Sequence, residues 1–199
     1  MLFFFISIGH LQAADNLKKL EESLLSEEKH SRYWQYGWTS FFIADMGVKA
    51  LIVSNSNQQD KIYDAKVEFV KSSIATIAMF VRPMNLHKIG HELKKDISKE
   101  ERRNIIIQGI AREQRERSFK AHLGSVALNL AGSLFIWLDD DRKDDALLKF
   151  ALGMMVGELK IFSSPIKTWK KYQSIDDKSF FEQVSFRPLL NGLAFTYSF

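Results

Sequence analysis

Residues 33–53 read YWQYGWTSFFIADMGVKALIV, a segment that opens on aromatic residues and then turns largely apolar. The polar run SNSNQQD at 54–60 interrupts it, and a second apolar segment at 67–81 leads to Arg82 and Pro83. Proline lacks an N–H and its ring clashes with the preceding turn, so a helix ends there. The stretch 33–83 therefore predicts a helical hairpin.

A second hairpin is predicted further along the chain. Its first apolar segment, LGSVALNLAGSLFIWL at 123–138, ends at three aspartates, and its second, at 146–162, is closed by Pro165. Both segments are long enough for several helical turns. Residues 117–166 therefore repeat the order of apolar helix, polar turn, apolar helix and proline.

The two hairpins resemble each other in sequence as well as in order. Placing Arg32 over Arg117 brings Ser40 over Ser125 and Gly47 over Gly132 without a gap. We interpret the hairpins as duplicated units, because order, lengths and terminators agree. The alternative is that any two helical hairpins look this similar.

The flanking segments are more polar. At 15–32 the leucines stand three and four residues apart among charges, which is typical of an amphipathic surface helix. The stretch 84–116 predicts a charged linker helix, whose start is marked by a capping box formed by Ser98 with Glu101 three residues later. The expected fold is all-α: two duplicated hydrophobic hairpins resembling a four-helix bundle, with amphipathic flanking helices and a tail at 167–199 that ends in a short extended strand.

The N-terminal residues carry a targeting pattern. Residues 1–8 read MLFFFISI, and the following segment contains the small residues Ala13 and Ala14, as a signal-peptidase site requires. The apolar run is shorter than a bilayer span and is followed by polar residues, so 1–14 predicts a cleaved signal peptide. No Lys or Arg precedes the run, so a buried N-terminal helix or a short anchor is the alternative.

The last nine residues read NGLAFTYSF, in which apolar or aromatic residues alternate with small or polar ones. This period of two is that of a strand. The ending resembles the C-terminal signal of outer-membrane β-barrel proteins, which finish on an aromatic residue such as Phe199. The repeated ten-residue strands of a barrel are not seen upstream. The resemblance therefore implies a strand and, at most, a location in the cell envelope.

Composition excludes several function classes. The chain has no cysteine, so it has no disulfide, thiolate zinc site or cysteine nucleophile. Its net charge is +4, but basic and acidic residues are interspersed, which gives nucleic-acid binding little support. We find no nucleotide-binding glycine loop and no nucleophile elbow, and we predict neither a cofactor nor an enzymatic activity.

Charged residues inside the apolar segments are the main candidates for a functional site. They are Asp45, Lys49, Lys71 and Glu158. A charge at mid-bilayer costs about 3 kcal/mol on insertion scales, so these groups must be paired, snorkelling or outside lipid. Asp45 and Lys49 stand one turn apart and can pair. If the second helices of the two hairpins are neighbours, Lys71 can meet Glu158 in a buried pair that marks an ion path or serves only structure.

Other residues favour membrane contact. Tryptophans stand near the ends of the apolar segments, where interfacial anchors are expected: Trp34, Trp38, Trp137 and Trp169. Small residues recur four apart and would let helices approach closely: Gly153 with Gly157, and Ala127 with Ala131. The same patterns also occur in water-soluble cores, so a membrane-embedded and a soluble bundle both remain open.

Two weak metal sites complete the candidates. His87 and His91 stand four apart, but Lys88 replaces the glutamate of a zinc-protease motif, so two solvated histidines are preferred. The acidic run 139–145 lacks the glycine and glutamate of an EF-hand. Its aspartates instead suit the start of the following helix.

These observations predict an exported, membrane-associated envelope protein with a structural role or a protein- or lipid-binding role. Membrane lipid is the expected partner, and a protein partner or a second copy is the alternative. The contact surfaces would be the amphipathic helices 15–32 and 98–120. The alternative is a small four-span inner-membrane transporter or channel subunit. The charged loops would then place the N-terminus in the cytoplasm, which conflicts with a cleaved export signal.

Overall fold

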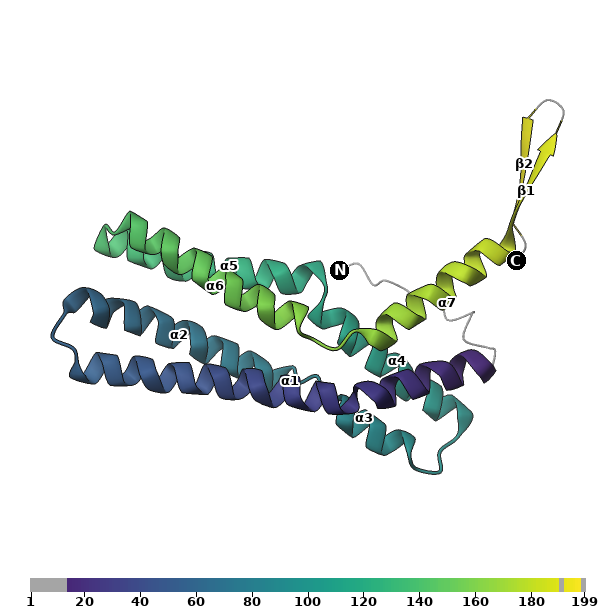
Figure 1. Cartoon of the computed structure of the whole chain (residues 1–199), viewed down its shortest axis with the longest axis horizontal. Helices are drawn as coiled ribbons and strands as arrows, with labels where there is room; N and C mark the ends of the chain where they lie inside the picture. The colour runs from purple at the N-terminus through teal and green to yellow at the C-terminus, as the bar shows by residue number, and fades with distance from the viewer. Residues whose placement is uncertain (1–13, 190–191, 198–199) are drawn as a thin grey trace.

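The computed structural model describes residues 14–189 and 192–197, and it is mostly helical (Figure 1). This confirms the expected all-α class. The predicted signal peptide, apart from Ala14, and the terminal Phe199 lie outside the described residues.

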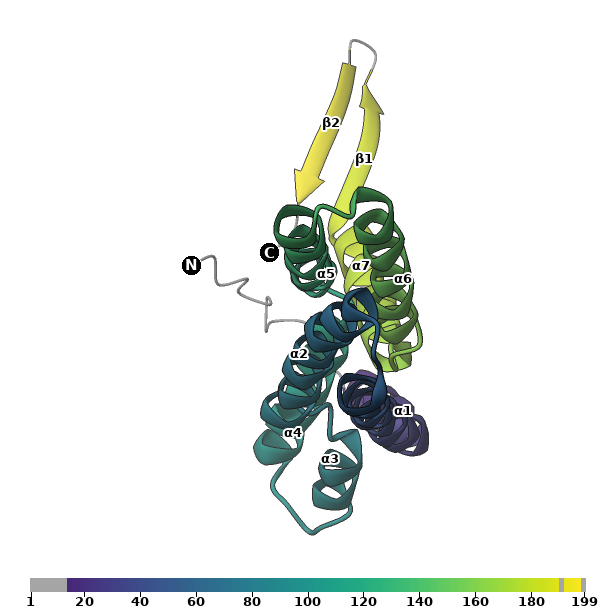
Figure 2. The same cartoon turned by 90° about the vertical axis from the view of Figure 1, so that its left-hand side faces the viewer.

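Two antiparallel helical hairpins form an elongated arm, which we define as residues 33–81 and 119–162. One hairpin joins the second half of α1 (Ala14–Asn55) to α2 (Gln59–Val81), and the other joins α5 (Phe119–Asp140) to α6 (Lys143–Phe162). Both turns lie at the same end of the molecule, the distal end (Figure 1). Seen end-on, α2 and α5 share one side and α1 and α6 share the other (Figure 2). The packing between hairpins is made mainly by α2 and α5.

The helix α1 contains two segments whose sequence patterns predict separate helices. The amphipathic stretch 15–32 and the apolar stretch 33–53 form one helix of 42 residues, about 63 Å long at 1.5 Å per residue. The helix is continuous because no proline or polar loop separates the two stretches. Its first half belongs to a different part of the molecule from its second half.

That other part, the base, is formed by residues 14–32 together with α3 (Leu86–Leu93), α4 (Lys99–Glu116) and α7 (Lys167–Gln183). Its apolar side chains are inside. The most deeply buried are Leu20, Leu24, Met84, Leu86, Ile106 and Ile110. The base therefore has the core of an ordinary water-soluble domain.

The predicted single linker helix at 84–116 is wrong in one respect, because it is two helices, α3 and α4. The Ser98 side chain accepts the N–H of Glu101 (3.1 Å), which confirms the predicted cap as the start of α4. Arg102 donates to the carbonyl of Leu93 (3.0 Å), the last residue of α3. The turn between the helices folds α4 back onto α1.

The segment 167–199, expected as a tail, begins with the helix α7. After it come β1 (Val184–Leu189) and β2 (Gly192–Tyr197), which pair antiparallel with Val184 opposite Tyr197.

The start of α7 is held by a buried carboxyl group. Glu113 of α4 is fully buried and accepts the N–H of Trp169 (2.8 Å). The first N–H groups of a helix have no partner within the helix, so this contact caps α7. Burial raises the pKa of Glu113 to about 7, although hydrogen bonds from Trp169 and Thr168 act in the opposite direction.

This burial predicts a pH-dependent stability. Because the folded protein binds the Glu113 proton more tightly than the unfolded chain does, the contribution is greatest below pH 4.5 and is lost as pH rises through 7. We expect a loss of up to about 3 kcal/mol between pH 4.5 and 8. Glu113→Gln should flatten this dependence in thermal unfolding in detergent. Glu101→Gln, on the exposed side of α4, is the control and should keep it.

Candidate functional site

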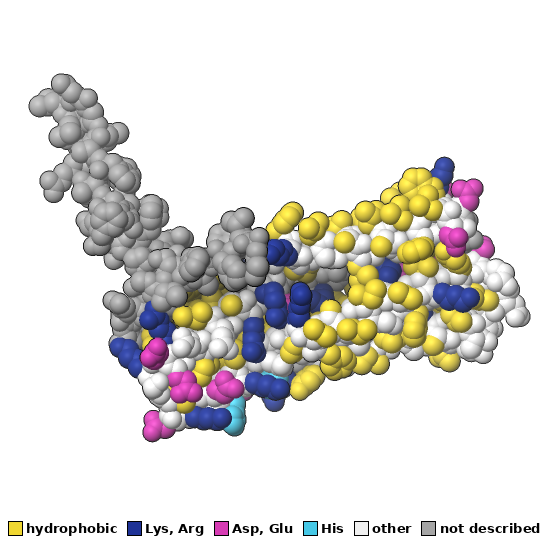
Figure 3. Space-filling view, turned by 180° about the vertical axis from the view of Figure 1, so that it is seen from behind, with side chains coloured by type: hydrophobic (Ala, Val, Ile, Leu, Met, Phe, Trp, Pro, Cys, Tyr) yellow, Lys and Arg dark blue, Asp and Glu magenta, His cyan; other side chains and the backbone are white. Residues whose placement is uncertain are grey.

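The arm carries its large apolar side chains on the outside. Ile77 is 60% exposed, Phe135 63% and Leu147 68%, and residues of this kind recur on all four arm helices. In Figure 3 apolar side chains cover much of the arm, whereas charged side chains are denser on the base. An exposed apolar surface of this extent is unusual for a protein surrounded by water.

The interior of the arm contains polar as well as apolar side chains. Its buried apolar residues include Phe42, Met79, Ile136 and Ile161. Its buried polar and charged side chains belong to Gln35, Thr39, Lys71, Ser72, Thr76, Asn129 and Ser133. In water-soluble proteins a lysine is almost never fully buried unless it is paired. The arm thus differs from the base in its exposed apolar surface and in the buried lysine.

A cavity of about 590 Å³ lies between the two hairpins. The hollow opens on the face shown in Figure 3, next to basic side chains. Its charged lining consists of Asp45, Lys49, Glu68, Lys71, Arg82, Arg115, Glu116, Lys120, Lys149 and Lys160. Three of the four charges predicted from sequence, Asp45, Lys49 and Lys71, therefore share one cavity.

Two ion pairs lie near the middle of the arm. Lys49 Nζ is 3.5 Å from Asp45 Oδ1, and the hydroxyl of Ser72 donates to Asp45 Oδ2 (2.6 Å). Lys71 Nζ is 3.0 Å from Glu68 Oε1, one turn earlier on α2. Each interior charge on α1 and α2 thus has a local partner, which offsets the cost of removing it from water.

Lys71 also fills the contact between the hairpins. A Cβ on Gly132 of α5 would lie 2.6 Å from Lys71 Cδ, and a Cβ on Gly153 of α6 would lie 3.1 Å from Lys71 Nζ and would overlap the Asn129 side chain. Glycine is required at these positions because there is no room for a side chain. The lysine stem therefore extends from α2 across α5 toward α6.

The end of the cavity next to the base is basic. Arg115 and Lys160 both contact Glu116, at 2.9 Å and 3.3 Å. Arg82 and Lys120 are exposed at the same end, and neither has an acidic partner among the described residues. Positive charge thus exceeds negative charge at this opening.

The predicted pairing of Lys71 with Glu158 is wrong. Glu158 instead lies 2.8 Å from Nδ1 of His122 on α5. The inter-hairpin neighbour of α2 is α5, not α6. Lys71 is also about 9 Å deeper in the arm than Glu158, counted at 1.5 Å per residue from the base ends of their helices.

The tryptophans have different environments. Trp34 is buried and donates its indole N–H to the carbonyl of Lys160 (3.0 Å), and Trp38 donates to the hydroxyl of Ser163 (3.0 Å). These two connect α1 to the base end of α6. Trp169 stacks on Tyr172 in the base, and Trp137, 43% exposed, stands near the distal end. Only Trp137 has both the exposure and the place in the arm that an interfacial anchor requires.

The small residues separate into two groups. Gly153 and Gly157 face α5, where they allow close contact with Asn129 and Ser125. Ala127 and Ala131 are exposed on the outside of α5, so they make no close helix contact within the described chain.

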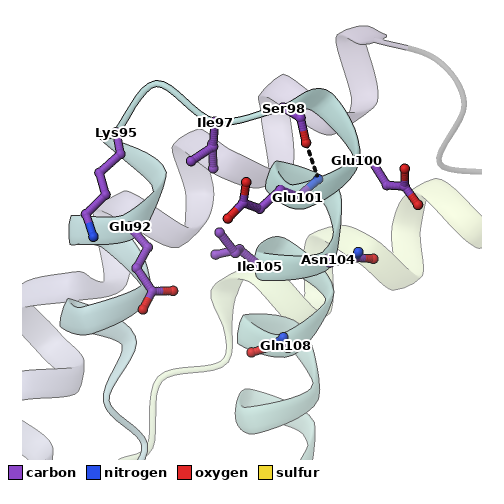
Figure 4. A pocket seen from close by; sticks show the side chains of 9 residues that line it. All are labelled: Glu92, Lys95, Ile97, Ser98, Glu100, Glu101, Asn104, Ile105 and Gln108. Atoms are coloured by element: carbon purple, nitrogen blue, oxygen red, sulfur yellow. Dashed lines mark hydrogen bonds between the residues drawn. The ribbon is translucent and has the colours of Figure 1, made fainter.

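The candidate metal ligands do not converge. His87 is half-buried and His91 is exposed on α3, and burial together with Lys88 lowers the pKa of His87. The described residues contain no group of three His, Asp or Glu side chains placed to hold a metal ion. A second pocket, of about 550 Å³, lies between α3 and α4, but Glu100 points away from Glu92 and Glu101 there (Figure 4).

Several lining residues were missed by the sequence analysis. Glu68 stands three residues before Lys71, a spacing that places both on one helix face. Asn129 interrupts an apolar segment, and a polar residue at such a position indicates a candidate for a functional site. Helix spacing could have identified Glu68, whereas only the tertiary structure relates Asn129 to Lys71.

By length and composition alone, one helical stretch among the described residues, 99–139, is long and apolar enough to cross a membrane. Comparison with known protein families, curated proteins and solved structures finds no match.

The close contact at Gly153 can be tested by substitution. Gly153→Ala should lower Tm in detergent, because displacing Asn129 costs about 1–3 kcal/mol, more than the roughly 1 kcal/mol of helix propensity that alanine gains over glycine. Gly47→Ala on α1 is the control, since an added Cβ there meets nothing within 4 Å. An equal rise of Tm in both variants would contradict the packing described.

Proposed function

We propose that the arm is embedded in a lipid bilayer and that the protein is a small four-span membrane protein of the transporter or channel class. The observation that carries this proposal is the apolar exterior of the arm, with Ile77, Phe135 and Leu147 outside, together with the polar groups of Lys71 and Asn129 inside it. In water each exposed large apolar side chain forgoes about 1.5–3 kcal/mol of burial. In a bilayer the apolar exterior would contact lipid chains, and the polar groups inside the arm would be kept away from them.

Helix lengths support the same proposal. The helices α2, α5 and α6 have 23, 22 and 20 residues, which corresponds to about 30–35 Å, close to the hydrocarbon thickness of a bilayer. Asp45, Lys49 and Lys71 lower the hydropathy of α1 and α2, and all three line the cavity.

The distribution of charge favours one orientation. The distal segments 54–64 and 139–145 contain seven acidic and three basic residues, whereas 82–118 at the base contains ten basic and six acidic residues. Basic segments are retained on the cytoplasmic side of inner membranes. The proposal therefore places the base in the cytoplasm, and it is incompatible with a leader that exports residue 15.

An exported envelope protein with a structural or binding role is the second candidate. It is favoured by Ala127 and Ala131, which lie four apart on the outside of α5, among exposed apolar residues. Small residues at this spacing allow close approach of another helix. In that case the apolar exterior would contact a second copy or a protein partner as well as lipid.

Single cysteines can test both embedding and orientation, because the chain has none of its own. The variants are Asn57→Cys at the distal end, Glu100→Cys in the base and Ile77→Cys on the apolar exterior, all at exposed positions. With a membrane-impermeant maleimide on host cells, Asn57→Cys should react in intact cells and Glu100→Cys only after lysis. Ile77→Cys should react only after denaturation in SDS.

Two results would contradict the proposal. Rapid reaction of Ile77→Cys in native membranes would place the arm in water. Reaction of Glu100→Cys but not Asn57→Cys in intact cells would reverse the orientation and favour the exported protein.

A further inference from the structure

The cavity between the hairpins has an excess of positive charge. Its lining contains seven Lys or Arg side chains and three carboxylates. A low-dielectric wall strengthens the field of such charges, so that the cavity attracts ions of one sign. With this balance the attracted ions are anions.

The basic residues are distributed along the depth of the arm. Arg82, Arg115 and Lys120 lie at the base end, and Lys71 lies about 15 Å further in, ten residues before the end of α2. Lys49 and Lys149 lie about 9 Å from the distal end, six residues from the turns of their helices. A cation is therefore present at three levels of the arm.

The levels differ in how strongly the cations are paired. At the base end, exposed Arg82 and Lys120 have no acidic partner among the described residues. Deeper in the arm, Lys71 contacts Glu68 (3.0 Å), and Lys149 contacts Asp64 (3.4 Å). An entering anion would meet unpaired charge first and then cations whose attraction is partly balanced, which allows it to leave again.

We propose that this cavity is a path for small inorganic anions, entered at Arg82 and Lys120 and passing Lys71. The proposal depends on the membrane embedding proposed above and names the class of solute. Cations are disfavoured by the same charges, because rings of Lys and Arg are the arrangement found in anion-selective pores.

The test uses the full-length protein in liposomes of neutral phospholipid, with chloride as the probe. Vesicles filled with potassium chloride are diluted into chloride-free medium, valinomycin carries the potassium, and an electrode records the chloride released. A parallel assay with vesicles filled with potassium gluconate and a proton ionophore records potassium release. We expect chloride release above that of protein-free vesicles and no potassium release.

Two variants remove the cations at different levels. Arg82→Gln with Lys120→Gln should slow chloride release by about tenfold or more, the lower end of the effect of electrostatic focusing. Glu68→Gln with Lys71→Gln should also slow chloride release, but by less, because the attraction of Lys71 is partly balanced by Glu68. This variant leaves no unpaired buried charge. Lys88→Gln, exposed on α3 outside the cavity, is the matched control and should release chloride at the wild-type rate. Gel filtration and circular dichroism check that each variant is folded.

The outcomes separate this inference from the function on which it depends. Potassium release in place of chloride release, or chloride release that is equal in all variants, would overturn the anion path and leave the membrane embedding intact. If no flux is seen while Ile77→Cys is protected in the same liposomes, the anion path is overturned and the membrane embedding is kept. An accessible Ile77→Cys would overturn both proposals.

Discussion

The contact of Lys71 with the glycines of the other hairpin is the constraint on which the arm depends. Its stem lies over Gly132 and its ammonium group approaches Gly153, so neither position has room for a side chain. Removing an ammonium group from water costs several kcal/mol unless a partner is close, and Glu68 at 3.0 Å is that partner. The hairpins therefore meet through a polar contact, and the space that remains between them is the cavity.

The base determines where the arm is held. The first half of α1 is fixed in the core by Leu20 and Leu24, and the second half continues into the arm without a break. Trp34 and Trp38 then connect α1 to the end of α6 through Lys160 and Ser163. Because α7 begins shortly after this point and is capped by Glu113 of α4, the second hairpin is connected to the base at both of its ends.

Much of the fold could be predicted from local signals, and much of the site could not. Apolar runs ended by Pro83 and Pro165 identify both hairpins, and Ser98 identifies the start of α4. Helix periodicity does not say which helices are neighbours, so the sequence leaves Glu158 as a candidate partner of Lys71, whereas in the structure α5 lies beside α2. The same limit applies to Trp34, whose position at the start of an apolar segment indicates an interface, whereas in the folded chain it is buried against α6.

The two parts of the chain differ in what they expose. The base buries leucine and isoleucine and exposes charge, whereas the arm exposes leucine and phenylalanine and buries lysine, serine and asparagine beside Phe42 and Met79. The mean hydropathy of −0.16 counts residues irrespective of burial, so it does not show this difference. Buried ion pairs can often be replaced by well-packed apolar residues at little cost in stability. Stability alone therefore does not account for the charges between the hairpins, whereas the proposed anion path does.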